Sequence, residues 1–102
     1  MTRVTTRRWA CVTAGEYDRA TDSVVVNEAV VDTVAGALGV PDERVRGAIL
    51  AHELAHATAG DLARDADEQR ARAAALAAGG HDVVQAIDEL LRATRNADRP
   101  GG

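Results

Sequence analysis

The sequence predicts a single α+β domain spanning 1–102, in which a short N-terminal β-hairpin is followed by about four helices. Before residue 28, Val, Thr and aromatic residues gather in short runs that are typical of strands. After that point, apolar residues recur at helical spacing in four segments that Gly or Pro residues separate. A length of 102 residues fits one small domain.

The hairpin is expected to pair residues 8–14 with residues 22–27, because both runs are rich in β-forming residues. Three turn-forming residues accompany these runs: Gly15, Asp18 and Asp22. The run "SVVVN" contains three consecutive Val residues, which favours a buried strand over an exposed edge that could pair with a peptide. The polar ends of the chain, 1–8 and 94–102, are expected to be disordered.

Two helices are expected in the middle of the chain. The first follows Asn27, which can act as its N-cap, and ends at Gly39. The second opens at Pro41, has Asp42 as a plausible N-cap, and stops at Gly60.

Two further helices complete the expected fold. The third is rich in Ala and covers 61–79, with Asp61 as a candidate N-cap. The fourth follows "GGH" and is amphipathic. Its apolar side consists of Val83, Val84, Ile87, Leu90 and Leu91.

The composition limits the partners that the chain can have. Phe is absent and most hydrophobic residues are Ala or Val, so the core is thin and would benefit from a bound metal or a partner. The net charge is -4 and the Arg residues are interspersed with acids, which argues against a nucleic-acid surface. Cys11 is the single cysteine, which suits a reducing compartment. No signal peptide and no apolar run of about 20 residues is found, so a cytoplasmic protein without a membrane partner is expected.

The most informative stretch is "AILAHELAHATAGD", in which His52 and His56 stand four residues apart. Residues four apart share one face of a helix, with Cβ atoms about 5–6 Å from each other. Zinc takes nitrogen and oxygen ligands in tetrahedral geometry, so both imidazoles can bind one Zn²⁺ ion. Glu53 stands beside the first histidine, where its carboxylate can act as general base toward a water at that ion. The alternative is an ordinary helix that carries two histidines, but the helix signals on both sides of the motif favour the zinc site.

Two histidines do not complete a zinc site, and the following helix offers the missing carboxylate. The spacing excludes the metzincin pattern, because Ala59 and Leu62 stand where that pattern has Gly and His. Four acidic residues are available: Asp61, Asp65, Asp67 and Glu68. Glu68 is preferred as third ligand because an apolar stripe continues from it along the helix, and Asp65 remains the alternative. Asp67 is expected on a solvated face.

Together, "VRGAILAHELAHATAGD" and the downstream "EQRARAAALAAGG" resemble the gluzincin metallopeptidases, in particular the ImmA/IrrE-type family. The chain also resembles, more weakly, the HtpX-like peptidases without their hydrophobic spans. The resemblance implies a small zincin-like domain with the active-site helix in the middle. It further implies that His52, His56 and Glu68 bind zinc, that Glu53 is the catalytic base, and that the substrate is a peptide or protein.

The chain departs from that family in two respects: the connection from His56 to Glu68 is short, and one supporting residue differs. Arg72 stands where the family has an Asn or Asp that supports a histidine ligand. If Asp65 is the ligand instead, Gln69 takes that place. A peptidase also needs a group that stabilises the oxyanion of the transition state. Candidates for that role are Tyr17, Arg72 and His81.

Three functions fit these observations. The first is a zinc-dependent metallopeptidase, a hydrolase that cleaves peptide bonds with Glu53 as general base. The second is a zinc-stabilised protein-interaction module without catalysis, which the short chain and the thin core favour. The third is a metal-free helical domain that forms oligomers through the helix at 83–91.

Overall fold

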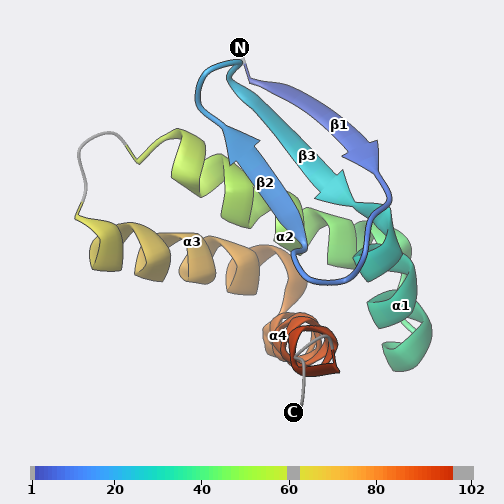
Figure 1. Cartoon of the computed structure of the whole chain (residues 1–102). Coiled ribbons are helices and arrows are strands. Elements are labelled where there is room, and N and C mark those ends of the chain that lie inside the picture. Colours follow the sequence, from blue (N-terminus) through green and yellow to red (C-terminus); the bar gives the residue numbers. More distant parts are fainter. Residues whose placement is uncertain (1, 60–62, 98–102) are drawn as a thin grey trace.

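The computed structural model of the chain describes residues 2–59 and 63–97 and confirms the α+β class. In these residues a three-stranded sheet precedes four helices (Figure 1). The strands are β1 (Arg3–Arg7), β2 (Gly15–Asp18) and β3 (Ser23–Asn27). The helices are α1 (Glu28–Leu38), α2 (Asp42–Ala57), α3 (Arg64–Gly79) and α4 (His81–Ala97). None of the described helices combines the length and the apolar character needed to cross a membrane.

The sheet has the order β1-β3-β2, so β3 is its central strand. β1 runs parallel to β3 and β2 runs antiparallel to it, and Val25 pairs with Thr5 on one side and with Glu16 on the other. Side chains alternate between the two faces of a strand, and Val24 and Val26 are fully buried. The run "SVVVN" is therefore a buried central strand, as expected, and β2 is an edge strand that contacts α2.

The expected hairpin is wrong in its first strand. Residues 8–14 form a connection, and the strand that pairs with β3 is 15–18, where turn residues were expected. Residues 3–7 were expected to be disordered but form β1. All five residues of β1 are exposed, so the strand carries no alternation of apolar and polar residues. Its pairing with β3 joins segments far apart in the sequence, which a local pattern does not reveal.

Asn27 holds the connection between β1 and β2 against the end of β3. Its buried side chain forms four hydrogen bonds. Oδ1 accepts from the backbone N–H groups of Trp9 at 3.2 Å and Ala29 at 3.1 Å. Nδ2 donates to the carbonyl oxygens of Ala10 at 3.2 Å and Thr13 at 2.9 Å. The bond to Ala29 also caps α1, as the sequence predicted.

Helix α1 has the expected ends, whereas α2 differs at both: it ends at Ala57, capped by Thr58, earlier than the expected stop at Gly60. α1 is followed by Gly39, whose φ of 68° lies in the left-handed region that Gly adopts without a steric penalty. The expected N-cap of α2 is wrong by one residue: Pro41 occupies the cap position and Asp42 is the first helical residue. As a first-turn residue, Asp42 interacts favourably with the helix dipole instead of capping the helix.

The last two helices differ from expectation at their ends. α3 begins at Arg64 in the described part of the chain, and the expected boundary residues Gly60 and Asp61 lie outside it. α4 continues to Ala97, so residues 94–97 of the expected tail are helical, whereas 98–102 lie outside the described residues. The apolar face of α4 packs on the core, which explains why the helix continues past the last apolar stretch.

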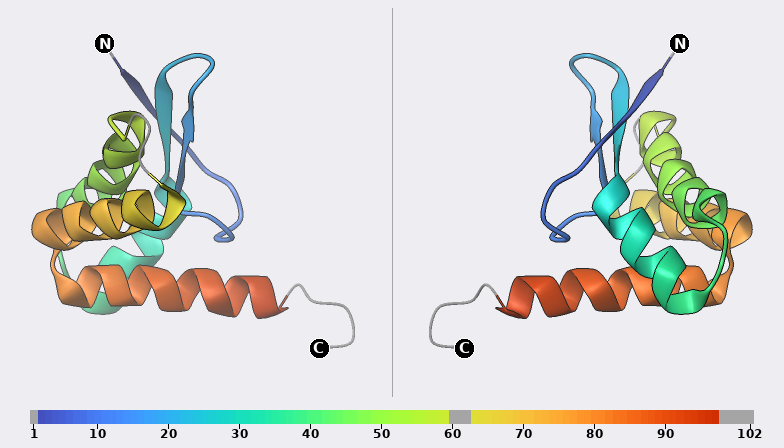
Figure 2. Two further views of the ribbon diagram at one scale, coloured as in Figure 1. Left: turned by 90° about the vertical axis from the view of Figure 1, so that its left-hand side faces the viewer. Right: turned by 90° about the vertical axis from the view of Figure 1, so that its right-hand side faces the viewer.

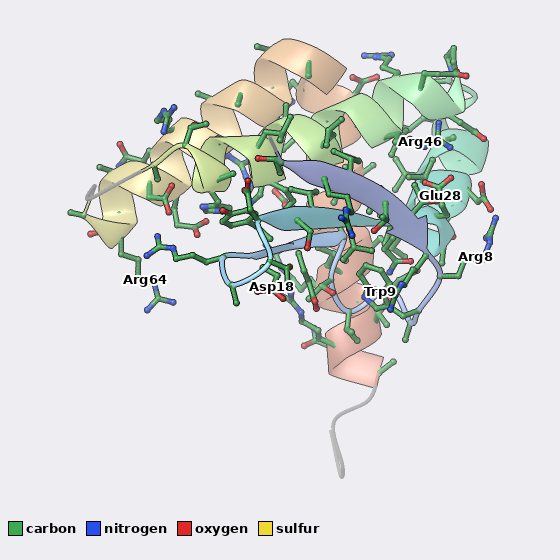
Figure 3. The ribbon with its side chains drawn as sticks, turned by 90° about the horizontal axis from the view of Figure 1, so that it is seen from above. Arg8, Trp9, Asp18, Glu28, Arg46 and Arg64 are labelled. Carbon is green, nitrogen blue, oxygen red and sulfur yellow. The ribbon has the colours of Figure 1, made fainter. Side chains whose placement is uncertain are left out.

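Helix α2 lies at the centre of the molecule and packs against β2, β3, α1, α3 and α4. The sheet and α4 lie on opposite sides of the pair formed by α2 and α3 (Figure 2). Arg46 of α2 donates to both carboxylate oxygens of Glu28 in α1, at 3.0 and 2.6 Å (Figure 3). The buried hydrophobic residues are Val, Ala and Ile, and such small side chains fill the interior only if the elements approach closely.

At Gly79, the junction where α3 ends before α4, the backbone lies close to helix α2. A Cβ atom at this position would lie 2.5 Å from Cβ of Ala48 in α2. Arg44 of α2 closes the same junction, because its Nε donates to the carbonyl oxygen of Gly79 at 2.8 Å and its NH2 pairs with Asp82 at 2.6 Å. The junction is therefore built around the absence of a side chain at Gly79.

Replacing Gly79 with Ala should lower the free energy of unfolding by about 1–3 kcal/mol, because the added methyl group overpacks the contact with Ala48. Gly36→Ala is the matched control in α1, since no atom lies within 4 Å of a Cβ built there. Ala is the better helix former by roughly 0.5–1 kcal/mol, so the control should be neutral or stabilising. Urea unfolding followed by circular dichroism measures both. A Gly79→Ala variant as stable as wild type would contradict the close approach.

Candidate metal centre

His52 and His56 lie one turn apart on α2 and direct their Nε2 atoms toward each other. The two Nε2 atoms are 3.1 Å apart, and the rings stand edge to face with centroids 4.8 Å apart. Two nitrogen ligands of a tetrahedral zinc ion, at bond lengths of about 2.0–2.1 Å, are separated by about 3.3–3.4 Å. His52 and His56, the expected ligands, therefore converge, and the distance between their Nε2 atoms is close to that between two ligands of one zinc ion.

Asp67 of α3 supports His56 from the side opposite its Nε2. Oδ2 of Asp67 accepts a hydrogen bond from Nδ1 of His56 at 2.9 Å. A carboxylate has no proton to donate, so His56 carries its hydrogen on Nδ1 and keeps the lone pair of Nε2 for a metal. The expectation that Asp67 lies on a solvated face is wrong. The first turn of α3 packs against the last turn of α2, and periodicity within α3 does not reveal that crossing.

Glu68, the expected third ligand, follows Asp67 and also approaches His56. Its Oε1 lies 3.6 Å from Nε2 of His56, which is compatible with two ligands of one ion. The Glu68 side chain is 59% exposed and stands outside the compact group of His52, Glu53 and His56, whose ligand atoms all lie within 4.8 Å of one another. Asp65 is exposed at the start of α3. The geometry favours Glu68 over Asp65, and its role as ligand stays a prediction.

Glu53, the expected base, is a buried carboxyl group. It is 7% exposed, and its Oε2 has no hydrogen-bond partner in the described part of the chain. The pKa of Glu53 is raised to about 7, mainly by burial; His56 lowers it, and Glu68 and Glu16 raise it. A Cβ atom at Gly15 would lie 3.3 Å from Cγ of Glu53, so β2 covers this side chain closely. A buried polar atom without a partner costs free energy, which marks Glu53 as a group that a bound water or ligand would satisfy.

His52 is held in its neutral form. Burial lowers the pKa of His52 and the neighbouring His56 lowers it further, although Glu68, Asp88 and Asp67 act in the opposite direction. A neutral imidazole is the form that binds a metal. The chemistry of the donor set therefore fits a zinc ion: two imidazoles, one of them oriented by a carboxylate, with a further carboxylate within reach.

A cavity of about 210 Å³ lies beside His52 and Glu53. It is bordered by the residues that lead into β2 and by α2, α3 and α4. Its walls are largely apolar and include Ala48, Ile49, Ala75, Val84, Ile87 and Leu91. Three charged side chains also line it: Arg72, Asp88 and Arg95. The site thus opens onto a small apolar space with charged groups at its border, a common form for a ligand site.

Of the three candidates for oxyanion stabilisation, Arg72 alone is among the residues that line the cavity. Arg72 forms an ion pair with Asp88, at 2.9 Å. The Tyr17 hydroxyl donates to Asp22 at 3.1 Å, which fits a structural role in the hairpin. His81 is the exposed first residue of α4.

Sequence reasoning missed two of the charged residues at the cavity, Asp88 and Arg95. A signal was present, because Asp88, Leu91 and Arg95 follow one another at spacings of three and four on α4. Residues at this spacing share the face that the apolar residues of α4 turn toward the cavity.

Comparisons of the chain with models of protein families, with curated proteins and with solved structures give no match. The residues of this site and their geometry therefore carry any assignment of function.

Asp67→Asn should weaken zinc binding by about 10-fold or more, because His56 loses the carboxylate that orients it. Competition with a chromophoric zinc chelator measures the affinity. Asp65→Asn is the matched control, since it removes the same charge from the first turn of α3. An Asp65→Asn variant that binds zinc more weakly than Asp67→Asn would contradict this assignment and favour Asp65 as ligand.

In zinc-free protein, Glu53→Gln should raise stability above pH 7 but not below pH 4.5. The folded carboxyl group keeps its proton up to a pKa of about 7, whereas the unfolded one releases it near 4.5. The wild type therefore loses stability as the pH rises through this window, by up to about 3 kcal/mol, and Gln has no proton to lose. Urea unfolding in chelator at pH 4, 6 and 8 measures the difference. The exposed Glu89→Gln is the control, and a pH-independent effect of Glu53→Gln would contradict the raised pKa.

Proposed function

We propose that this protein is a zinc-dependent metallopeptidase of the gluzincin type, with His52, His56 and Glu68 as zinc ligands and Glu53 as general base. The observation that carries the proposal is the convergence of two histidine Nε2 atoms, 3.1 Å apart, beside a buried carboxyl oxygen that has no partner among the described residues. The carboxylate of Asp67 on His56 supports it, because such a partner accompanies most metal-binding histidines. The resemblance of "HELAH" and its surroundings to gluzincins points the same way.

Hydrolysis of a peptide bond needs an activated water and a proton donor for the leaving amine. Bound zinc polarises a carbonyl group and lowers the pKa of a water ligand toward about 7. Glu53 lines the same cavity as His52, so its free oxygen can take the proton of the attacking water. The same carboxyl group can then deliver that proton to the leaving amine, which balances the reaction. Arg72, one of the two Arg residues that line the cavity, is the candidate for stabilising the oxyanion.

The edge strand β2 lies beside this site and could pair with an extended peptide. In the described residues β2 pairs with β3 on one side only, and its first residue, Gly15, lies against Glu53. The free N–H and C=O groups of an edge strand can pair with an added strand. A substrate on β2 would pass over Glu53 and could place one side chain in the apolar cavity.

A zinc-stabilised interaction module without catalysis is the second candidate. It is favoured by the position of the site, because Asp67 and Glu68 of α3 meet His56 of α2 there, and a metal would tie the two helices together. The small side chains of the core make such a tie valuable. This candidate predicts that zinc removal unfolds the chain and that no substrate is cleaved. The metal-free oligomer has less support, since the apolar residues Val83, Val84 and Ile87 are buried within the chain.

Glu53→Gln should still bind one zinc ion per chain but lose at least about 100-fold in the rate of peptide hydrolysis, because Gln cannot accept the proton. Zinc is measured by mass spectrometry on protein purified without chelator or affinity-tag metal. Hydrolysis is measured by mass spectrometry on a mixed peptide library.

Glu89→Gln, on the exposed side of α4, is the control and should cleave at the wild-type rate. Hydrolysis that is insensitive to Glu53→Gln would exclude this mechanism. Zinc binding with no Glu53-dependent cleavage would leave the interaction module, and no zinc binding after added zinc would exclude both.

A further inference from the structure

We propose that Arg95 binds a carboxylate of the substrate, so that the site acts on peptides that carry this group close to the bond that is cleaved. The inference rests on the proposed function, because it concerns the substrate of the same site. Binding of uncleaved peptides tests it separately from hydrolysis.

The cavity follows one face of α4 from Val84 to Arg95. These two residues are eleven positions apart, so the lined length of the helix is about 16 Å. An extended peptide rises about 3.3 Å per residue, so about five residues cover this length. A short peptide in this cavity can therefore lie along α4 as far as Arg95, in the same cavity that His52 and Glu53 line.

Arg95 is fixed in place while most of its donors stay free. Its Nε donates to the carbonyl oxygen of Val12 at 2.8 Å. Val12 belongs to the connection that Asn27 and the Trp9–Thr13 hydrogen bond hold in place. Among the described residues, the two terminal nitrogens of Arg95 have no hydrogen-bond or ion-pair partner. Arg95 is exposed, and this one hydrogen bond holds its side chain toward the connection while its terminal nitrogens can bind a ligand.

Of the three charged side chains at the border of the cavity, Arg95 is the one without an ion-pair partner among the described residues. Arg72 is paired with Asp88 at 2.9 Å, so these two charges offset each other. Arg95 then adds one positive charge at the border of an apolar space. The planar guanidinium presents parallel N–H groups, which match the two oxygens of a carboxylate.

The apolar walls next to Arg95 define the rest of the ligand. Leu91 and Ile87 lie one and two turns before Arg95 on the same face of α4 and line the cavity. A carboxylate on Arg95 would thus be accompanied by an apolar side chain against these residues. The carboxylate can be the C-terminus of a peptide or an acidic side chain, and the experiment below separates the two.

The test measures binding of three peptides to the full chain carrying Glu53→Gln and loaded with zinc, so that no cleavage occurs. The peptides are acetyl-Ala-Ala-Leu as free acid, the same peptide as C-terminal amide, and acetyl-Ala-Glu-Leu amide. Calorimetry should give the free acid an affinity about 10-fold or more above the amide, because a charge-assisted pair is lost in the amide. Tight binding of the third peptide would support a side-chain carboxylate as the source.

Adding Arg95→Gln should bring the ratio of the two affinities to about 1, and Arg95→Lys should leave an intermediate ratio, because it keeps the charge without the planar donors. Arg92→Gln is the matched control on the exposed side of α4 and should keep the full preference. Circular dichroism checks that each variant is folded. A preference for the acid that survives Arg95→Gln would overturn the inference, since the metal would then bind the carboxylate.

Failure of this inference and failure of the proposed function give different results. Equal binding of all three peptides, together with Glu53-dependent hydrolysis, overturns the role of Arg95 and leaves the peptidase intact. An Arg95-dependent preference without any hydrolysis supports carboxylate binding and excludes the peptidase.

Discussion

The other elements of this structure depend on one constraint: their backbones must lie close to helix α2. The buried hydrophobic residues are no larger than Ile, so the interior is filled by bringing backbones together rather than by large side chains. Two glycines make this possible. At Gly15 the strand β2 reaches Ile49 and Glu53, and at Gly79 the junction of α3 and α4 reaches Ala48.

The same closeness creates the chemical character of the site. β2 shields Glu53 from water, and the start of α3 places Asp67 against His56. Within the described part of the chain, the buried Oε2 of Glu53 has no hydrogen-bond partner, which is unfavourable unless a ligand or water binds there. A small core leaves little stability to offset that cost, so a ligand that satisfies these groups would stabilise the fold as well as supply chemistry.

Asn27 links the fold to the far end of the cavity. Its hydrogen bonds fix both the start of α1 and the connection that carries Val12 and Thr13. That connection contributes Thr13 to the lining of the cavity and, through Val12, the acceptor for Arg95. Asn27, at the end of β3, therefore helps to fix the carbonyl group of Val12, to which Arg95 of α4 donates.

The sequence by itself determined the features that rest on local spacing. The i, i+4 spacing was enough to bring His52 and His56 together, and Asn27 and Gly39 were enough to bound α1, because each signal acts within a few residues. The tertiary structure alone decided the parallel strand β1, the contact of Asp67 with His56, the burial of Glu53 under Gly15, and the place of Arg95 at the cavity. Each of these depends on how two elements cross, and crossing geometry is set by the packing of small side chains across the whole core, which periodicity within one element does not encode.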